Sequence, residues 1–165
     1  MKRVLICAAI AIALVGCGRS AFFDFTGSAT YAEALPHTKR GELVDRFESK
    51  ALISASYLNA IYPNNKDYNG TETFLIGLYI ANDFSAKEKS GLNNPNYSLS
   101  LNGEKPSDVQ IVDKNDPLLK LMPLVNRWSR YYIVRFARAE KLALSLAEAD
   151  TNQSIVIAFE KPLAE

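Results

Sequence analysis

Histidine and cysteine, the side chains that most metal sites and many nucleophilic catalysts use, are nearly absent from this chain. The 165 residues include one histidine, His37, and two cysteines, Cys7 and Cys17. A zinc site takes several ligands of these two kinds, so the sequence predicts none. No serine stands in a Gly-x-Ser-x-Gly context, and a catalytic triad would have to use His37, between Pro36 and Thr38 in chain expected to be exposed. We therefore predict no enzyme activity, no metal and no cofactor.

An excess of charge of one sign is also missing. The sequence has 19 basic and 18 acidic side chains. The two kinds are interleaved along the chain instead of gathering in one run. Nucleic-acid binding depends on a clustered basic face that neutralises phosphates. We therefore predict no nucleic-acid partner.

Long apolar runs are limited to one, close to the N-terminus. Lys2 and Arg3 precede an uncharged apolar run of 12 residues over 4–15. The apolar region of a signal peptide has about 7 to 15 residues, whereas a helix that spans a bilayer needs about 20. The run therefore predicts a signal peptide and not a permanent transmembrane helix.

The last two residues of this run and the two residues after it resemble the lipobox of bacterial lipoproteins. Its four residues are Leu14-Val15-Gly16-Cys17. The resemblance implies that the signal peptide, residues 1–16, is cut off between Gly16 and Cys17, and that the thiol of Cys17 carries a diacylglycerol. Each buried methylene of an acyl chain contributes about 0.8 kcal/mol, so two or three chains anchor a protein firmly to a membrane. Gly18 follows where aspartate would favour the inner membrane, so the same resemblance predicts the outer membrane, on its periplasmic or surface face.

The mature chain then has no cysteine available for a disulfide, because Cys7 leaves with the signal peptide and Cys17 carries lipid. Removal of 16 residues from 165 leaves 149, enough for one domain with its own core. We expect a lipidated tether over 17–37, followed by a single domain over 38–165. The tether has three aromatic rings that either pack on the domain, which we favour, or contact a membrane. They belong to Phe22, Phe23 and Phe25.

A short helix is predicted near 38–48, at the start of this domain. Thr38 can cap the helix. Leu43, Val44 and Phe47 then share one face at helical spacing. Pro36 prevents a long helix before this point.

After the predicted helix, apolar residues tend to recur at every second position, which is typical of strands. Ile53, Ala55 and Tyr57 form one side of the first predicted strand. The turn-rich stretch 63–70 separates it from a strand over 73–81, which is apolar on both faces and is expected to be central. Further strands are predicted over 98–101, 109–111, 131–136 and 155–159.

The segment 140–149 fits either a helix or a strand. Its Ala, Leu, Glu and Lys content favours a helix, whereas Leu142, Leu144 and Leu146 fall at every second position. We predict a strand that a hairpin turn over 150–152 joins to the last strand, and we keep the helix as the alternative.

About seven short strands with one helix in front predict a mainly β fold, an antiparallel sandwich. The strand number and Trp128 resemble the immunoglobulin-like sandwiches of bacterial surface and periplasmic lipoproteins, over roughly 49–160. This resemblance is architectural and implies no function by itself.

The segment 116–130 is too apolar for a freely solvated loop. We favour a long crossover that packs over the open end of the sandwich. The other interpretation is an exposed patch that recruits a partner, with Trp128 and Arg130 as its anchors. The apolar residues of the segment are Leu118, Leu119, Leu121, Met122, Leu124, Val125 and Trp128.

Oxygen ligands that could bind calcium stand close together at Asp113, Asn115 and Asp116. Their spacing lacks the glycine and the distal glutamate of an EF-hand loop. A turn before Pro117 explains these residues, and we interpret them as turn residues.

Two classes of function follow. The preferred one is a non-enzymatic envelope lipoprotein that acts as a protein-binding or structural module at the outer membrane or cell surface. The alternative is a periplasmic accessory or pilot lipoprotein that assists assembly of a secreted or outer-membrane protein. Both predict a membrane contact through the lipid on Cys17 and a protein partner.

Overall fold

The structure is a computed structural model that describes residues 31–83 and 89–162. The predicted signal peptide, Cys17 and the three phenylalanines of the tether lie outside the described residues. The described chain contains eight strands: β1 (Thr38–Asp45), β2 (Glu48–Tyr57), β3 (Thr71–Ile80), β4 (Tyr97–Leu101), β5 (Asp108–Val112), β6 (Arg130–Ala137), β7 (Leu142–Glu148) and β8 (Ser154–Phe159). Its helical segments are short: α2 (Tyr31–Ala34), η1 (Leu35–His37), α3 (Leu58–Ile61), η2 (Lys66–Tyr68), η4 (Gly91–Asn93) and η5 (Pro117–Leu121). No helix among the described residues has the length and apolar content that crossing a membrane requires.

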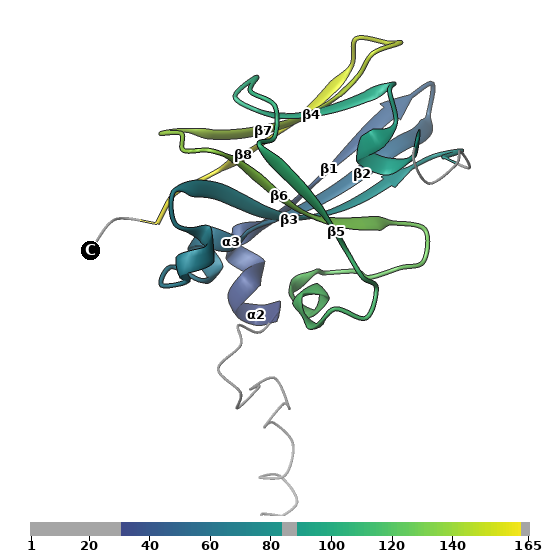
Figure 1. Ribbon diagram of the computed structural model, residues 1–165. Helices are drawn as coiled ribbons and strands as arrows, with labels where there is room; N and C mark the ends of the chain where they lie inside the picture. The colour runs from purple at the N-terminus through teal and green to yellow at the C-terminus, as the bar shows by residue number, and fades with distance from the viewer. Residues whose placement is uncertain (1–30, 84–88, 163–165) are drawn as a thin grey trace, which may run out of the picture.

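The strands form a sandwich of two antiparallel sheets, which confirms the predicted fold class. One sheet has five strands in the order β1-β2-β3-β6-β5, and the other has three in the order β4-β7-β8. In Figure 1 the three-stranded sheet lies on one side of the five-stranded sheet, and α2 and α3 lie on the other side. The strand predicted to be central, β3, is the middle strand of the larger sheet.

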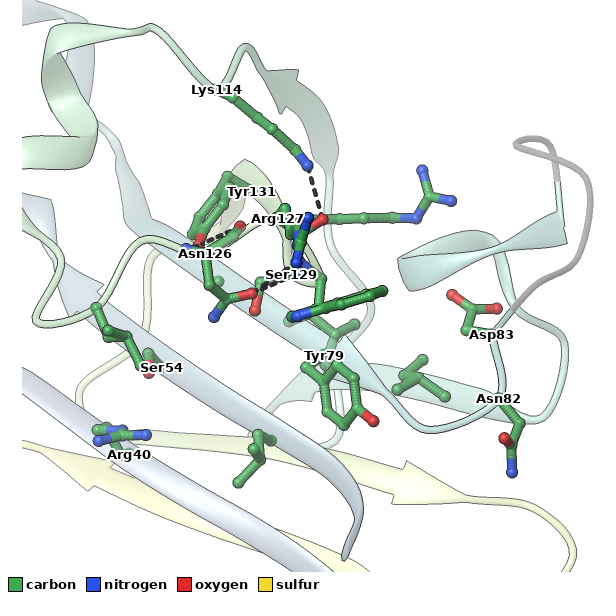
Figure 2. Close-up of a pocket in the computed structure, with 17 residues that line it drawn as sticks. Arg40, Ser54, Tyr79, Asn82, Asp83, Lys114, Asn126, Arg127, Ser129 and Tyr131 are labelled. Atoms are coloured by element: carbon green, nitrogen blue, oxygen red, sulfur yellow. Dashed lines mark hydrogen bonds between the residues drawn. The ribbon is translucent and has the colours of Figure 1, made fainter.

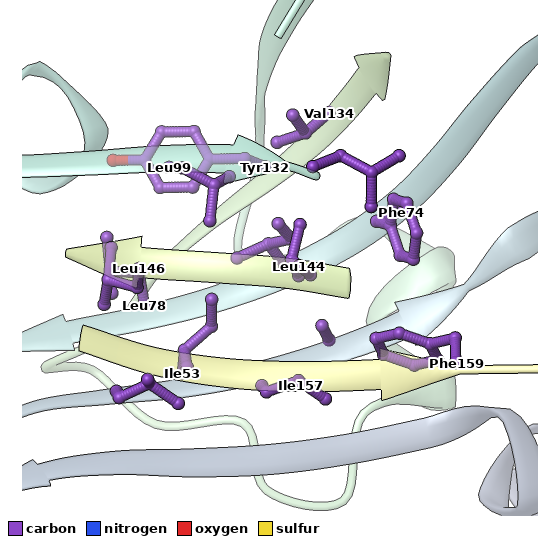
Figure 3. Close-up of a cluster of buried hydrophobic side chains, with 14 of the residues drawn as sticks. Ile53, Phe74, Leu78, Leu99, Tyr132, Val134, Leu144, Leu146, Ile157 and Phe159 are labelled. Carbon is purple, nitrogen blue, oxygen red and sulfur yellow. The ribbon is translucent and has the colours of Figure 1, made fainter. Parts of the chain in front are cut away.

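Alternate residues of the strands meet between the two sheets and form the main core (Figure 3). Phe74, Ile76 and Leu78 of β3 are buried there. Each side chain of this size contributes about 1.5–3 kcal/mol when it is fully buried. The smaller sheet supplies Leu99, Leu101, Leu142, Leu144, Leu146, Ile155, Ile157 and Phe159.

The ambiguous segment 140–149 forms strand β7, as predicted. It pairs with β8 in a register that places Leu144 opposite Ile157 and Leu146 opposite Ile155. The three leucines of β7 are buried in the same core as these isoleucines. Burial of one face by strand pairing therefore outweighs the helix propensity of the segment.

The predicted helix over 38–48 is wrong, because most of that segment is strand β1. Thr38–Asp45 pairs antiparallel with β2 along its whole length. Only Leu43 of the predicted apolar face is buried, whereas Val44 is 47% exposed and Phe47 is fully exposed in the turn before β2. Gly41 faces the core, where a Cβ atom would lie 2.3 Å from Cγ2 of Ile155. The close approach of β8 to β1 thus requires a glycine that would also weaken a helix.

Residues 31–37, which the sequence analysis assigned to the tether, form α2 and η1. Ala34 is completely buried, and the hydroxyl of Thr38 donates a hydrogen bond of 2.9 Å to the Ala34 carbonyl oxygen. The packed part of the described chain therefore includes this segment as well.

A second cluster of buried side chains lies on the outer face of the five-stranded sheet. Leu75 of β3 and Tyr131 of β6 point to this face, opposite to their neighbours in the main core. The cluster also contains Ala34 of α2, Leu58 of α3, and Leu119, Leu121 and Met122 from the loop between β5 and β6. Short helical segments and one long loop thus cover part of this face.

The position of the apolar segment 116–130 differs from the prediction of a crossover. Strands β5 and β6 are antiparallel neighbours, so residues 113–129 form a long hairpin loop, here called the β5–β6 loop. The loop folds onto the outer face of the five-stranded sheet and does not close the end of the sandwich, because its buried apolar residues belong to the second cluster. Trp128 lies in this loop and is 65% exposed, unlike the buried tryptophan of immunoglobulin domains.

Candidate functional site

A hollow of about 680 Å³ lies on the outer face of the five-stranded sheet, beside the second cluster. We call it the Trp128 hollow, because Trp128 lines it together with residues of β1, β2, β3 and β6. Figure 2 shows the strand residues Arg40, Ser54 and Tyr79 on one side and Asn126 and Ser129 of the β5–β6 loop on the other. This volume is within the range of about 300–1,000 Å³ that is typical of ligand sites.

Strand register explains why the sheet is hollowed at this place. Arg40 pairs with Ser54, Ser54 pairs with Gly77, and Gly77 pairs with Tyr131, so the four residues form one row across β1, β2, β3 and β6. The two middle positions carry the smallest side chains of the row. A Cβ atom on Gly77 would lie only 3.0 Å from Cε1 of Tyr131. Because Gly77 has no side chain, the Tyr131 ring can lie against its backbone. The small Ser54 side chain leaves open space beside Gly77.

The loop segment that borders the hollow is held by several hydrogen bonds. The Asn126 side-chain oxygen accepts from the backbone N–H groups of Trp128 and Ser129, at 2.9 and 2.8 Å. The Asn126 N–H donates to the Tyr131 hydroxyl at 2.9 Å, and Lys114 Nζ donates to the Arg127 carbonyl oxygen at 2.8 Å. The dashed lines in Figure 2 mark contacts of this set. Trp128 is consequently exposed on an ordered loop.

Both residues predicted as partner anchors, Trp128 and Arg130, line the Trp128 hollow. Cζ of Arg127 lies 4.9 Å from the centroid of the Trp128 ring, which is a cation–π distance. Leu124, which also lines the hollow, is 60% exposed, and Val125 is 44% exposed. The part of the loop that follows Pro123 thus carries exposed apolar side chains.

The hollow is lined by four basic side chains and one acidic side chain. The acid is Asp83, whose carboxylate accepts from the Gly91 N–H at 2.6 Å and from the Asn94 side-chain amide at 3.2 Å. The bases are Arg40, Lys114, Arg127 and Arg130. The lining therefore has a positive charge that the acid within it offsets only in part.

A smaller hollow of about 430 Å³ adjoins the first. Lys114, Arg130 and Tyr131 line both of them. The smaller one also includes Tyr132, whose hydroxyl accepts from the Leu92 N–H at 3.2 Å. Burial raises the pKa of Tyr132, so this phenol stays neutral at ordinary pH.

The residues considered for calcium binding make the contacts of turns. Asp113 accepts from the Asn115 N–H at 2.8 Å, and Asp116 accepts from the Leu118 N–H at 2.8 Å as the cap of η5. His37 is half-buried at the end of η1 and does not line the Trp128 hollow. Within residues 31–83 and 89–162, no three His, Cys, Asp or Glu side chains are grouped as a metal site would require.

A buried carboxylate at the other end of β3 was missed by the sequence analysis. Glu72 is 2% exposed and accepts from Lys161 Nζ at 2.6 Å, from the Tyr57 hydroxyl at 2.5 Å and from the Ala139 N–H at 3.2 Å. Burial, followed by the hydrogen bond to Glu72, raises the pKa of Tyr57. These contacts connect the segment after β8 to the core, and we assign Glu72 a structural role.

No protein-family model matches this chain, and neither a curated protein nor a solved structure does. The basis for a function is therefore the Trp128 hollow, which combines a concave shape, an exposed aromatic ring and basic side chains.

Proposed function

We propose that the protein is a non-enzymatic lipoprotein of the bacterial envelope, anchored through Cys17, that binds a protein partner at the Trp128 hollow. The observation that supports binding at this place is the convergence of an exposed Trp128 with Tyr79, Arg127 and Arg130 around a concave surface. Tryptophan, tyrosine and arginine are the residues most enriched at the energetic centres of protein interfaces.

The preorganised loop strengthens this proposal. An interface loses affinity when it must order mobile side chains on binding, at about 0.5–1.5 kcal/mol for each. The backbone on both sides of Trp128 is already fixed by Asn126 and Lys114. The backbone next to the ring therefore needs little further ordering when a partner binds.

Photo-crosslinking in intact cells tests the proposed function. A photoreactive residue replaces Val125 next to the hollow or, as the matched control, Val156 on β8, which is 64% exposed and does not line the hollow. We expect a discrete protein adduct from position 125 that Trp128→Ala abolishes, and no such adduct from position 156. Identical adducts from both positions, or an adduct that is insensitive to Trp128→Ala, would contradict the proposal. Cys17→Ser is included and is expected to move the protein from the membrane to the soluble fraction.

Protease treatment of the same cells distinguishes the two classes of envelope function. Digestion of intact cells would favour a module on the cell surface. Protection until the outer membrane is opened would favour the periplasmic accessory lipoprotein, for which the crosslinked partner would be an envelope assembly protein.

A further inference from the structure

We infer that the partner segment bound in the Trp128 hollow is an extended acidic peptide, in which carboxylate side chains flank an apolar one. This inference rests on the proposed function, since it names the chemistry of the partner at the same site.

The positive charge of the lining is the first observation that favours an acidic partner. The whole chain has a formal net charge of only +1, so a basic surface is not a consequence of composition. Four basic side chains nevertheless line this hollow with the single acid Asp83, whose two oxygens already accept hydrogen bonds. A ligand that complements this lining carries negative charge.

Among the described residues, the arginines of the hollow have no carboxylate partner. No ion pair between described residues includes Arg40, Arg127 or Arg130. Arg135, on the other half of β6, does pair with Asp108 at 2.6 Å. Guanidinium groups bind carboxylates in a two-pronged geometry, and a bound ligand can supply carboxylates here.

The uncharged part of the lining includes several apolar side chains, which favour an apolar side chain between the carboxylates. Leu52 and Tyr79 are directly opposite each other on β2 and β3, and Leu124 and Trp128 come from the β5–β6 loop. The space between them exists because Ser54 and Gly77 are small. An apolar side chain that enters this space would be surrounded by apolar groups and bordered by the basic ones.

The shape of the surface favours a peptide over an anionic bilayer. Lys114 and Arg130 line the Trp128 hollow and also the second hollow, whose lining includes the acid Asp113. A peptide can insert one side chain into the Trp128 hollow and place its neighbours at the border. A flat lipid surface would contact the exposed border of a concave site and leave its floor at Ser54 and Gly77 empty.

The test uses Trp128, which is the only tryptophan of the chain, as the reporter. The full-length protein is titrated with a synthetic peptide in which glutamates flank one leucine, and with the same peptide carrying glutamines. We expect the glutamate peptide to shift the tryptophan emission to shorter wavelength and to saturate, with affinity that falls as salt is raised. The glutamine peptide is expected to bind at least about tenfold more weakly, since it loses several charge pairs.

Variants locate the interaction. Arg40→Gln and Arg127→Gln are each expected to weaken the glutamate peptide roughly two- to fivefold, as is usual for exposed ion pairs. Arg46→Gln, at the exposed turn between β1 and β2, is the matched control and should have no effect. Neither test residue forms an ion pair among the described residues, so the variants should fold normally.

Four outcomes overturn the inference. They are equal binding of both peptides, no binding of either, an equal response to vesicles of anionic phospholipid, and binding that appears only after Phe22, Phe23 and Phe25 of the tether are replaced by serine. The last two would assign the hollow to a membrane or to the protein's own tether. A crosslinked partner at position 125 together with equal peptide binding would leave the proposed function intact, so the two failures are distinguishable.

Discussion

Two halves of the β5–β6 loop have similar apolar sequences and opposite environments. In the first half, Leu119, Leu121 and Met122 are 4%, 1% and 5% exposed. In the second half, Leu124 and Trp128 are 60% and 65% exposed. Hydrophobicity of the segment therefore does not decide which part is buried.

The difference comes from the sheet surface beneath each half. The first half belongs to a cluster with Leu75 and Tyr131, which are large side chains on the outer face of the sheet. The second half borders the Trp128 hollow, where Ser54 and Gly77 offer little surface to cover. Burial of an apolar side chain needs a partner of matching size, because a void on one side forfeits the contacts that stabilise packing.

Truncation of one leucine in each half gives the largest expected contrast. Leu121→Ala should lower the free energy of unfolding by about 2–5 kcal/mol, because it removes a fully buried side chain and leaves a cavity. Leu124→Ala should change the free energy of unfolding by less than about 0.5 kcal/mol. Urea denaturation of both variants measures the difference, and equal losses would show that the second half is packed as firmly as the first.

A substitution of Asn126, in the second half of the loop, should have a smaller effect on the free energy of unfolding. Asn126→Ala removes the acceptor of two backbone hydrogen bonds and should cost about 1–2 kcal/mol in the free energy of unfolding. The tryptophan should also become more mobile, which time-resolved fluorescence anisotropy measures. Asn126→Asp keeps the acceptor oxygen and should restore the anisotropy. If alanine and aspartate behave alike, the side-chain oxygen does not fix the loop.

Most of the fold was predictable because the periodicity of a strand is visible in a short stretch of sequence. Alternation predicts β6 and β8, and an apolar run after a turn-rich stretch predicts β3. For β7, the alternating leucines favour a strand although the composition also fits a helix. Strand β1 was mistaken for a helix because the spacing of Leu43, Val44 and Phe47 fits a helical face. Its actual conformation depends on pairing with β2. This pairing cannot be recognised from the sequence of β1 alone.

The candidate site was predictable only where one segment carries it. Trp128 and Arg130 stood out because they end an apolar stretch that has no evident partner. Arg40, Ser54 and Gly77 come from three other strands and meet only through the register of the sheet. The available signal was a small residue at an outward position of an otherwise apolar strand, which Gly77 on β3 provides.

Ser54→Leu tests directly whether the size of the sheet side chains separates the two halves, and its effect on stability should be smaller than that of Asn126→Ala. Ser54 lines the Trp128 hollow and is half-buried, so a leucine would extend into existing space. The second half of the loop would then have an apolar surface to cover, as the first half has at Leu75. We expect the Trp128 emission to move to shorter wavelength while the free energy of unfolding rises by at most about 1 kcal/mol. The control Ser54→Thr adds less apolar surface and should leave the emission nearly unchanged. If Ser54→Leu leaves the emission unchanged, the exposure of Trp128 is set by the hydrogen bonds of Asn126 and Lys114, and the hollow persists because the loop is held away from the sheet.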